Sequence, residues 1–221
     1  RGKASFGMIC AEDEIGMGTS HDGIMVLNED AIVGEKASSY FNLSCDYQLE
    51  IGLTPNRCDA MGHIGVARDL KAYLNFHQKE NKKVKLPKIS IPGVKNSLAD
   101  FSIEVSDVEL CPTYMGAVIE NITIKASPEW LQKSLLAIDI EPINNIVDIT
   151  NFVMFEYGTP LHAFDYSKIG NKIVVKKGSK NDLFTTLDGI ERKLNGDELM
   201  ITNGKENLCI AGVYGGLSSG I

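Results

Sequence analysis

The sequence predicts an α+β protein in which helices and strands occupy separate stretches of the chain. Two runs between residues 127 and 158 have apolar residues at helical spacing and recognisable ends. After Asp165, short apolar runs of strand length alternate with turn residues. A charged run at 78–83 separates both regions from an N-terminal part with shorter patterns.

The bulk composition is that of an ordinary globular protein. Its 221 residues are enough for one large domain or two small ones. Hydrophobic residues make up 43% and charged residues 23%, so the chain can bury a core. The net charge of -7 argues against wrapping a nucleic-acid duplex, because such proteins carry a basic footprint. Any RNA contact is therefore expected to be local.

Cysteine usage and hydropathy indicate a cytoplasmic protein with no membrane partner. The chain starts with Arg-Gly-Lys, without an apolar signal region, and no apolar run approaches the ~20 residues that span a bilayer. The odd number of cysteines forms no Cys-x-x-Cys pair and no zinc spacing. Free thiols in a reducing compartment are expected for Cys10, Cys45, Cys58, Cys111 and Cys209.

The N-terminal part is expected to hold short strands and one helix. Residues 6–10, 24–27 and 49–53 have the apolar content of short strands. Asp59 is placed to cap a helix over about 60–78. The charged run after this helix leads into a segment with two prolines, which predicts a solvated linker and a domain boundary.

Beyond the linker, two strands and a helix are expected. Residues 101–105 alternate as a strand does, and residues 114–124 are a longer strand candidate. Ser127-Pro128-Glu129 predicts a helix start, because Ser caps, Pro suits the first helical position and Glu favours the positive helix end. One face of this helix is apolar, with Leu131, Leu135 and Ile138.

A second helix and a series of strands are expected to follow. The helix covers about 148–156 and ends at Gly158. The Asp188-Gly189 pair is typical of a hairpin turn. The expected strands are residues 173–176, 184–187, 191–194, 199–202 and 208–213.

Residues 142–165 combine many uncharged polar groups with apolar ones, which few folds require. Asn144 and Asn145 can bond backbone at the start of the helix, and Thr150 and Asn151 can do so within it. A single histidine such as His162 has a structural reading too, but a neutral imidazole can also orient an ester or a water molecule.

The segment resembles the editing domain in the β subunit of bacterial phenylalanyl-tRNA synthetase. Several motifs occur in the family's order: Ser5 to Glu14, Thr54-Pro55-Asn56-Arg57-Cys58-Asp59, Gly65-Val66-Ala67-Arg68-Asp69, Cys111-Pro112-Thr113-Tyr114, Leu187-Asp188-Gly189 and Ala211-Gly212-Val213-Tyr214-Gly215-Gly216. The resemblance implies three parts: the end of an OB-fold-like insertion (1–46), a small α/β module with linker (47–95), and an editing domain (96–221) truncated at its C-terminus. It completes the fold class as a mixed, mainly antiparallel sheet with a few packed helices.

The resemblance implies hydrolysis of the ester in Tyr-tRNA(Phe). Tyrosine differs from phenylalanine by one hydroxyl, which an apolar pocket rejects only by roughly 100-fold. A second site that hydrogen-bonds the hydroxyl would exclude phenylalanine, because its polar groups would be left unpaired. An editing site of this kind is what the family needs.

The resemblance also implies the site residues. His162 matches the editing histidine, and Thr150 and Asn151 match residues of its pocket. The small residues Ala211, Gly212, Gly215 and Gly216 would form a pocket wall that lets substrate approach the backbone. Read without the resemblance, those four residues form a tight turn between strands.

The family resemblance implies partners and cofactors beyond this chain. They are the synthetase α subunit and a second αβ pair (α2β2), the 3′ end of tRNA(Phe), and tyrosine as the edited amino acid. No metal and no cofactor are expected in this stretch, whereas the whole synthetase uses ATP and Mg²⁺. Nothing in the chain activates an amino acid.

Two positions depart from the family pattern. Glu141 stands where the family commonly has Arg before Pro-Ile-Asn-Asn. The family's carboxylate that reads the tyrosine hydroxyl lies beyond the Gly-Gly segment and is expected after Ile221. Both favour an alternative: a non-catalytic module that positions tRNA or α subunits, with a degenerate pocket.

Overall fold

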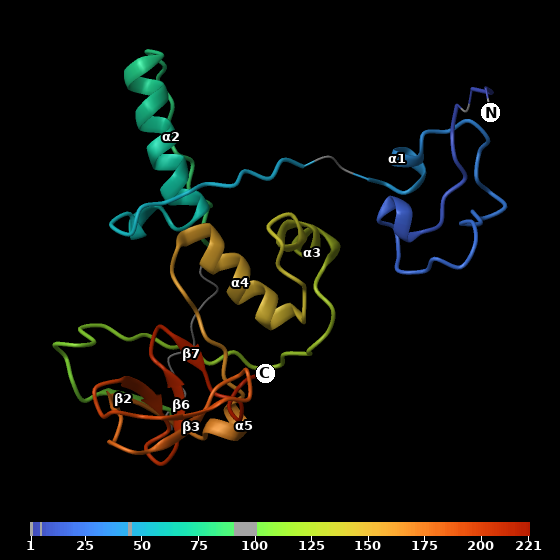
Figure 1. The fold of residues 1–221 in the computed structure, drawn as a ribbon. Helices are drawn as coiled ribbons and strands as arrows, with labels where there is room; N and C mark the ends of the chain where they lie inside the picture. Colours follow the sequence, from blue (N-terminus) through green and yellow to red (C-terminus); the bar gives the residue numbers. More distant parts are fainter. Residues whose placement is uncertain (1, 5, 44–45, 91–100) are drawn as a thin grey trace. The chain divides into compact units, whose positions relative to one another are not determined.

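The computed structural model describes residues 2–4, 6–43, 46–90 and 101–221. Two compact units, Arg1–Tyr47 and Gln48–Ile221, are described separately (Figure 1). The predicted α+β class, with a mixed and mostly antiparallel sheet, is confirmed. No helix in the described part of the chain has the length and hydropathy to cross a bilayer.

The N-terminal unit holds two short helices, η1 (Asp13–Ile15) and α1 (Ala37–Tyr40). The predicted strands at 6–10 and 24–27 are wrong, since no strand is assigned among its described residues. A backbone hydrogen bond from Met25 N to Cys10 O, 2.9 Å long, joins the two segments without a ladder. Apolar content alone does not make a strand, because a strand needs a continuous row of paired backbone groups.

The second unit begins with an extended segment that includes 49–53, where the predicted strand is also absent from the structure. A 3₁₀ turn, η2 (Cys58–Ala60), then leads into α2 (His63–His77), which confirms the predicted helix. Asp59 does not cap it. The N-cap is Gly62, and the Asp59 carboxylate instead accepts a hydrogen bond from Arg57 Nε at 3.0 Å.

Two packed helices follow, α3 (Glu129–Leu136) and α4 (Asn145–Tyr157). Leu131 and Leu135 of α3 are almost completely buried, as the apolar face predicted. Gly158 ends α4 with a φ of 77°, a left-handed conformation that glycine adopts without strain. The helix starts three residues earlier than expected, because Asn144 caps it by accepting from Ile146 N and Val147 N.

The polar side chains at the start of α4 tie it to the segment before α3. Asn145 Oδ1 accepts from Lys125 N, and its Nδ2 donates to Thr123 O. Ser127, predicted as a helix cap, instead donates its hydroxyl to Asp148 Oδ2, and Pro128 takes the N-cap position. The long-range partner outcompetes the local cap.

The sheet has the order β1-β2-β5-β6-β7, with β1 parallel to β2 and the remaining pairs antiparallel. A separate two-stranded sheet pairs β3 with β4. The strand bounds are β1 Ser102–Val105, β2 Lys172–Lys177, β3 Leu183–Thr185, β4 Glu191–Lys193, β5 Leu199–Thr202, β6 Asn207–Ile210 and β7 Tyr214–Gly215.

The predicted strands after Asp165 are confirmed in position, and three of them end earlier than expected. Residues 211–213 leave β6 and form a turn before β7. Residues 114–124, expected as a strand, carry no strand assignment, and Met115 and Ile119 are largely exposed. The β3–β4 hairpin turns at Asp188-Gly189 as predicted, with Gly189 at a φ of 76°.

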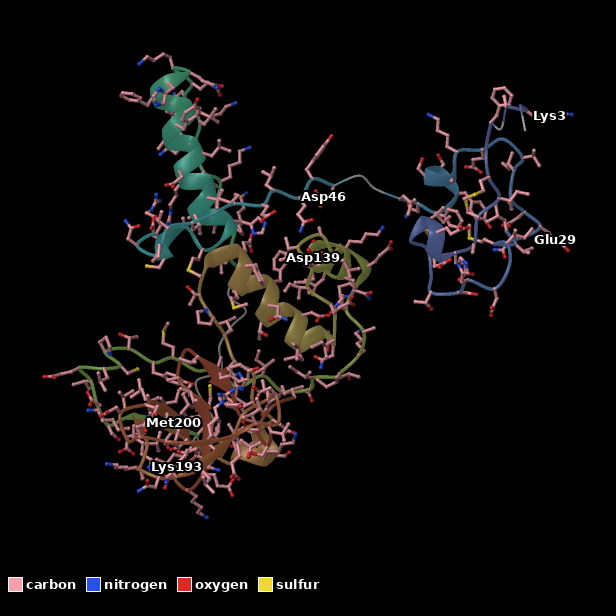
Figure 2. All side chains as sticks on the ribbon, in the orientation of Figure 1. Lys3, Glu29, Asp46, Asp139, Lys193 and Met200 are labelled. Atoms are coloured by element: carbon pink, nitrogen blue, oxygen red, sulfur yellow. The ribbon has the colours of Figure 1, made fainter. Side chains whose placement is uncertain are left out.

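Two apolar clusters hold the sheet region together. One is centred on Ile173, Val175 and Ile201 of the large sheet. The other joins Phe184 and Leu194 of the β3–β4 region to Met200 of β5, which Figure 2 labels. Met200 is fully buried. The two sheets are therefore packed through shared core contacts rather than connected only by the chain.

Candidate functional site

His162 lies in the loop between α4 and a short helix, α5 (Tyr166–Ile169). Asp165 closes this loop, because its carboxylate accepts from Ser167 N and caps α5. The loop is also attached to the end of the chain, since Asp165 N donates to Ser219 O and Lys168 Nζ donates to Gly220 O. These bonds set the position of His162 over the last strands.

The His162 ring lies directly against Gly215 of β7. A Cβ on Gly215 would lie 2.6 Å from His162 Cε1 and 2.9 Å from Leu187 Cδ1. The ring also meets Phe164 of its own loop, with centroids 4.4 Å apart in an edge arrangement. Only glycine at 215 leaves room for the imidazole at this strand end.

The surroundings of His162 favour its neutral form. Burial of the ring against protein atoms lowers the pKa of His162 below its ordinary value. The residue as a whole still reaches solvent, so water can meet the imidazole. A neutral ring with solvent access can hydrogen-bond a water molecule or an ester oxygen.

The three other small residues predicted for the site have different roles in the structure. Gly216 is buried, and a Cβ there would lie 2.6 Å from Leu208 O and 2.9 Å from the Phe184 ring. Gly212 has a φ of 70° and forms the exposed turn between β6 and β7. Ala211 extends the pairing with β5 through its N–H, which donates to Leu199 O. Of the four small residues, Gly215 is therefore the one that lies against the histidine ring.

Two of the backbone N–H groups in the predicted pocket wall are used by the fold. Ala211 N donates to Leu199 O and Gly216 N donates to Leu208 O, each at 2.8 Å. These two groups are therefore occupied. Of Gly212, Gly215 and Gly216, only Gly212 has open space where a side chain would stand, because a Cβ there would meet nothing within 4 Å.

Thr150 and Asn151 lie in the middle of α4, not in the histidine loop. The Thr150 hydroxyl donates to Val147 O within the helix at 2.7 Å. The contacts of the His162 ring described above come from its own loop, from β7 and from the β3–β4 turn, and none of them comes from α4. The predicted role of both residues in the pocket remains a prediction.

Leu187 is a residue of the site that sequence reasoning did not assign. Its side chain stands over Gly215 beside the His162 ring, and its N–H donates to Gly215 O at 3.1 Å. The available signal was its place immediately before Asp188-Gly189, because a hairpin turn fixes the residues next to it.

Two shallow depressions lie elsewhere, along α2, and neither includes His162. Their lining residues are Ile51, Leu53, Ala60, Val66, Asp69, Leu70 and Tyr73 in one, and His63, Ile64, Ala67, Val84, Lys85, Leu86, Pro87 and Glu156 in the other. The first is largely apolar, and in the second His63 Nδ1 is occupied by a hydrogen bond to Phe155 O. Among the described residues, no group of three or more His, Cys, Asp or Glu side chains is placed to hold a metal ion.

Comparison with known proteins defines the class of this fold and site. A family model described as the B3/4 domain matches residues 110–221, which include α3, α4, the histidine loop and β2 to β7. The match covers about half of the chain, and the chain belongs to the B3/4 domain family.

Over its whole length the chain is similar to the β subunit of phenylalanine–tRNA ligase, an aminoacyl-tRNA synthetase. It is 52% identical to that subunit of Bacteroides fragilis over 221 residues, covering 100% of this chain and 27% of the relative. The Bacillus subtilis subunit is 44% identical over 227 residues, covering 99% of this chain and 27% of the relative. The Fusobacterium nucleatum subunit is 43% identical over 218 residues, covering 98% and 26%. The chain thus spans about a quarter of the length of these relatives, and the resemblance seen in the sequence motifs is confirmed.

Proposed function

We propose that this chain is the editing region of a phenylalanyl-tRNA synthetase β subunit and hydrolyses Tyr-tRNA(Phe). The observation that carries the proposal is the contact of His162 with Gly215, at a strand end within the region similar to those subunits. The ring is solvent-accessible and favoured as neutral there. The three-part division of the chain at 1–46, 47–95 and 96–221 belongs to the same proposal.

In the proposed reaction, the oxygen of a water molecule attacks the carbonyl carbon of the tyrosyl ester. The carbonyl oxygen becomes an oxyanion, and collapse of the tetrahedral intermediate breaks the bond to the terminal ribose of tRNA, whose oxygen takes up the proton that the water loses. Tyrosine and the free ribose hydroxyl are the products. His162 hydrogen-bonds the water or the ester. This bond holds the reacting atoms in the orientation needed for attack.

The proposed setting is the cytoplasmic α2β2 synthetase. In it, the α subunit would use phenylalanine, ATP and Mg²⁺ to make Phe-tRNA(Phe), and the tRNA 3′ end would carry a misacylated tyrosine to the present region. The B3/4 domain would supply the hydrolysis step and no cofactor.

The proposal is tested by deacylation of Tyr-tRNA(Phe) with the complete α2β2 enzyme carrying His162→Ala. A loss of tyrosine release of about 10²-fold is expected, as for removal of a group that positions the reactants. Phe-tRNA(Phe) should stay intact with both enzymes. His77→Ala, which removes a histidine of α2, is the matched control and should hydrolyse at the wild-type rate. Equal rates for the wild type and His162→Ala would remove His162 from the mechanism.

A second candidate is a non-catalytic module that positions tRNA or α subunits. It is favoured by the use of Asn144, Asn145 and Thr150 in bonds within the fold, where they support α4. This candidate predicts that the wild-type enzyme releases no tyrosine above the spontaneous rate. It also predicts that His162→Ala changes aminoacylation and tRNA affinity rather than deacylation, so that a filter-binding titration separates the two functions.

A further inference from the structure

We propose that Arg192 is a positioning residue that holds the β3–β4 turn against β7, so that Leu187 and Gly215 enclose the His162 ring. This inference rests on the proposed editing function for its catalytic consequence, but its geometric part concerns His162 alone. Arg192 lies on β4 and reaches the site through other residues, not by its own contact with the histidine.

The guanidinium of Arg192 holds the β3–β4 turn in place by hydrogen bonds to two of its side chains. Arg192 Nε donates to Thr186 Oγ1 at 3.0 Å, and Nη2 donates to Asp188 Oδ2 at 2.9 Å. The Thr186 hydroxyl, which is fully buried, donates to Asp188 Oδ1 at 2.5 Å. The three side chains form a closed ring of hydrogen bonds, and two of them flank Leu187 in sequence. A planar guanidinium suits two such bonds at once, which the single point charge of a lysine does not.

The locked turn is joined to the segment that carries Gly215. Thr186 forms a bridge with Gly216, Leu187 N donates to Gly215 O, and Leu217 N donates to Thr185 O, the last two at 3.1 Å. The Arg192 guanidinium also lies over the ring of Tyr214, 6.0 Å from its centroid. Arg192 therefore contacts both partners of this junction, the turn and β7.

The consequence for His162 follows from the position of Leu187. The Leu187 side chain and the imidazole share the space over Gly215. If the turn moves away from β7, Leu187 leaves this space and the ring becomes more exposed to water. The cause of the lowered pKa of His162 is burial, so its pKa reports this movement.

The test follows the four histidines of the 221-residue chain by NMR of their ring Cε1–H signals. His162→Gln assigns the signal of His162. Arg192→Lys keeps the positive charge and loses the paired geometry, and it is expected to raise the pKa of His162 toward its ordinary value. Arg192→Gln should raise it at least as far. Lys193→Gln, which removes a charge from the neighbouring exposed residue of β4, should leave it unchanged.

The test must distinguish the charge of Arg192 from its hydrogen-bond geometry, because other charged groups lie near the contact between the β3–β4 turn and β7. Asp165 and Lys168 lie on the histidine loop and α5, and Asp188 and Arg192 on the hairpin. If Arg192 acted only through its charge, Arg192→Lys would leave the pKa of His162 unchanged, while Arg192→Gln and Lys193→Gln would raise it. That result overturns the proposal, as would an unchanged His162 titration in both Arg192 variants.

The catalytic consequence is measured on the α2β2 enzyme. Arg192→Lys should lower kcat for Tyr-tRNA(Phe) deacylation by about tenfold, with KM changed less than about twofold, because positioning is lost rather than binding. An unchanged kcat alongside a shifted His162 titration would overturn the catalytic part. If His162→Ala leaves deacylation unaffected while Arg192→Lys still shifts the titration, the proposed function fails and the positioning role stands.

Discussion

The Asp148 carboxylate, fully buried in α4, accepts the hydroxyl of Ser127 at 2.5 Å. Its other oxygen accepts from Ile143 N at 2.8 Å. One side chain thus satisfies two groups from separate loops and fastens α4 to the residues before α3. Several polar side chains of residues 142–165 therefore stabilise the fold around α4.

Asp148→Asn is expected to lower the free energy of unfolding by about 1–2 kcal/mol, because two hydrogen bonds to a carboxylate become weaker bonds to a neutral amide. Urea unfolding followed by tryptophan fluorescence measures this. Trp130, the single tryptophan, lies edge-on to Phe152, with centroids 5.5 Å apart, and reports on the α3–α4 contact. Glu141→Gln, at an exposed position, is the control and should unfold like the wild type. A stability loss under about 0.5 kcal/mol would contradict the role given to Asp148.

Gly215→Ala and Gly216→Ala should have different effects although they are neighbours. At 215 the new methyl would meet the His162 ring and Leu187, both side chains, so deacylation should fall while the fold persists. At 216 it would meet Leu208 O and the buried Phe184 ring, so the cost should appear as about 1–3 kcal/mol of stability.

Thermal unfolding and deacylation of both variants separate these effects. Gly220→Ala is the control, since its methyl would meet only Leu187 Cδ2 at 3.8 Å, an ordinary contact. If Gly215→Ala deacylates at the wild-type rate, the close contact with His162 has no functional weight.

Stability should fall on acidification in a way that depends on His162. Its pKa is lowered in the folded protein, so the unfolded chain binds the proton first as the pH falls. The contribution is fully present above the ordinary value of about 6.5 and is lost as the pH falls through the folded-state pKa. Between about pH 7.5 and about pH 5, the free energy of unfolding measured in urea should therefore fall more for the wild type than for His162→Gln. A difference that is constant with pH would contradict the burial of the ring.

Cys209 should resist alkylation in the native protein. It is buried in the sheet core, and this burial raises the pKa of its thiol to about 11. Cys58 is exposed, and thiolate is the reactive form, so Cys58 should be modified first and Cys209 last. Timed iodoacetamide labelling followed by peptide mass spectrometry gives the order, and labelling in urea, where burial is lost, should remove the difference. Early labelling of Cys209 would place it outside the core.

Most strands after Asp165 were predictable because they carry an apolar pattern or follow a turn signal, and β3–β4, β5–β6 and β6–β7 are pairs of neighbours in the sequence. The Asp188-Gly189 turn, for example, predicts β3 and β4 together. Residues 114–124 have a similar composition, but a strand is defined by hydrogen bonds to a partner that the sequence does not name. The predictions of Ser127 and Asp59 as helix caps were wrong because each side chain bonds another side chain instead. Ser127 bonds Asp148, and Asp59 bonds Arg57.

The site was predictable in part. The residue types and order marked His162 and the small residues of 211–216, but not which of them meet. The contact of His162 with Gly215 depends on the loop being pinned through Asp165 to Ser219, far along the chain. The enclosure by Leu187 and the lock by Arg192 are likewise properties of the folded hairpin, not of any local pattern.

The meeting of α2 with the end of α4 constrains how this region can evolve. A Cβ on Gly62, the N-cap of α2, would lie 2.7 Å from the backbone N of Gly158, and His63 Nδ1–H donates to Phe155 O beside it. The two glycines occupy one shared space between helix ends. A chimera that takes residues 96–221 from one relative and 48–90 from another would join two surfaces selected separately at this contact. Exchange of the two segments together should be tolerated where exchange of either one is not.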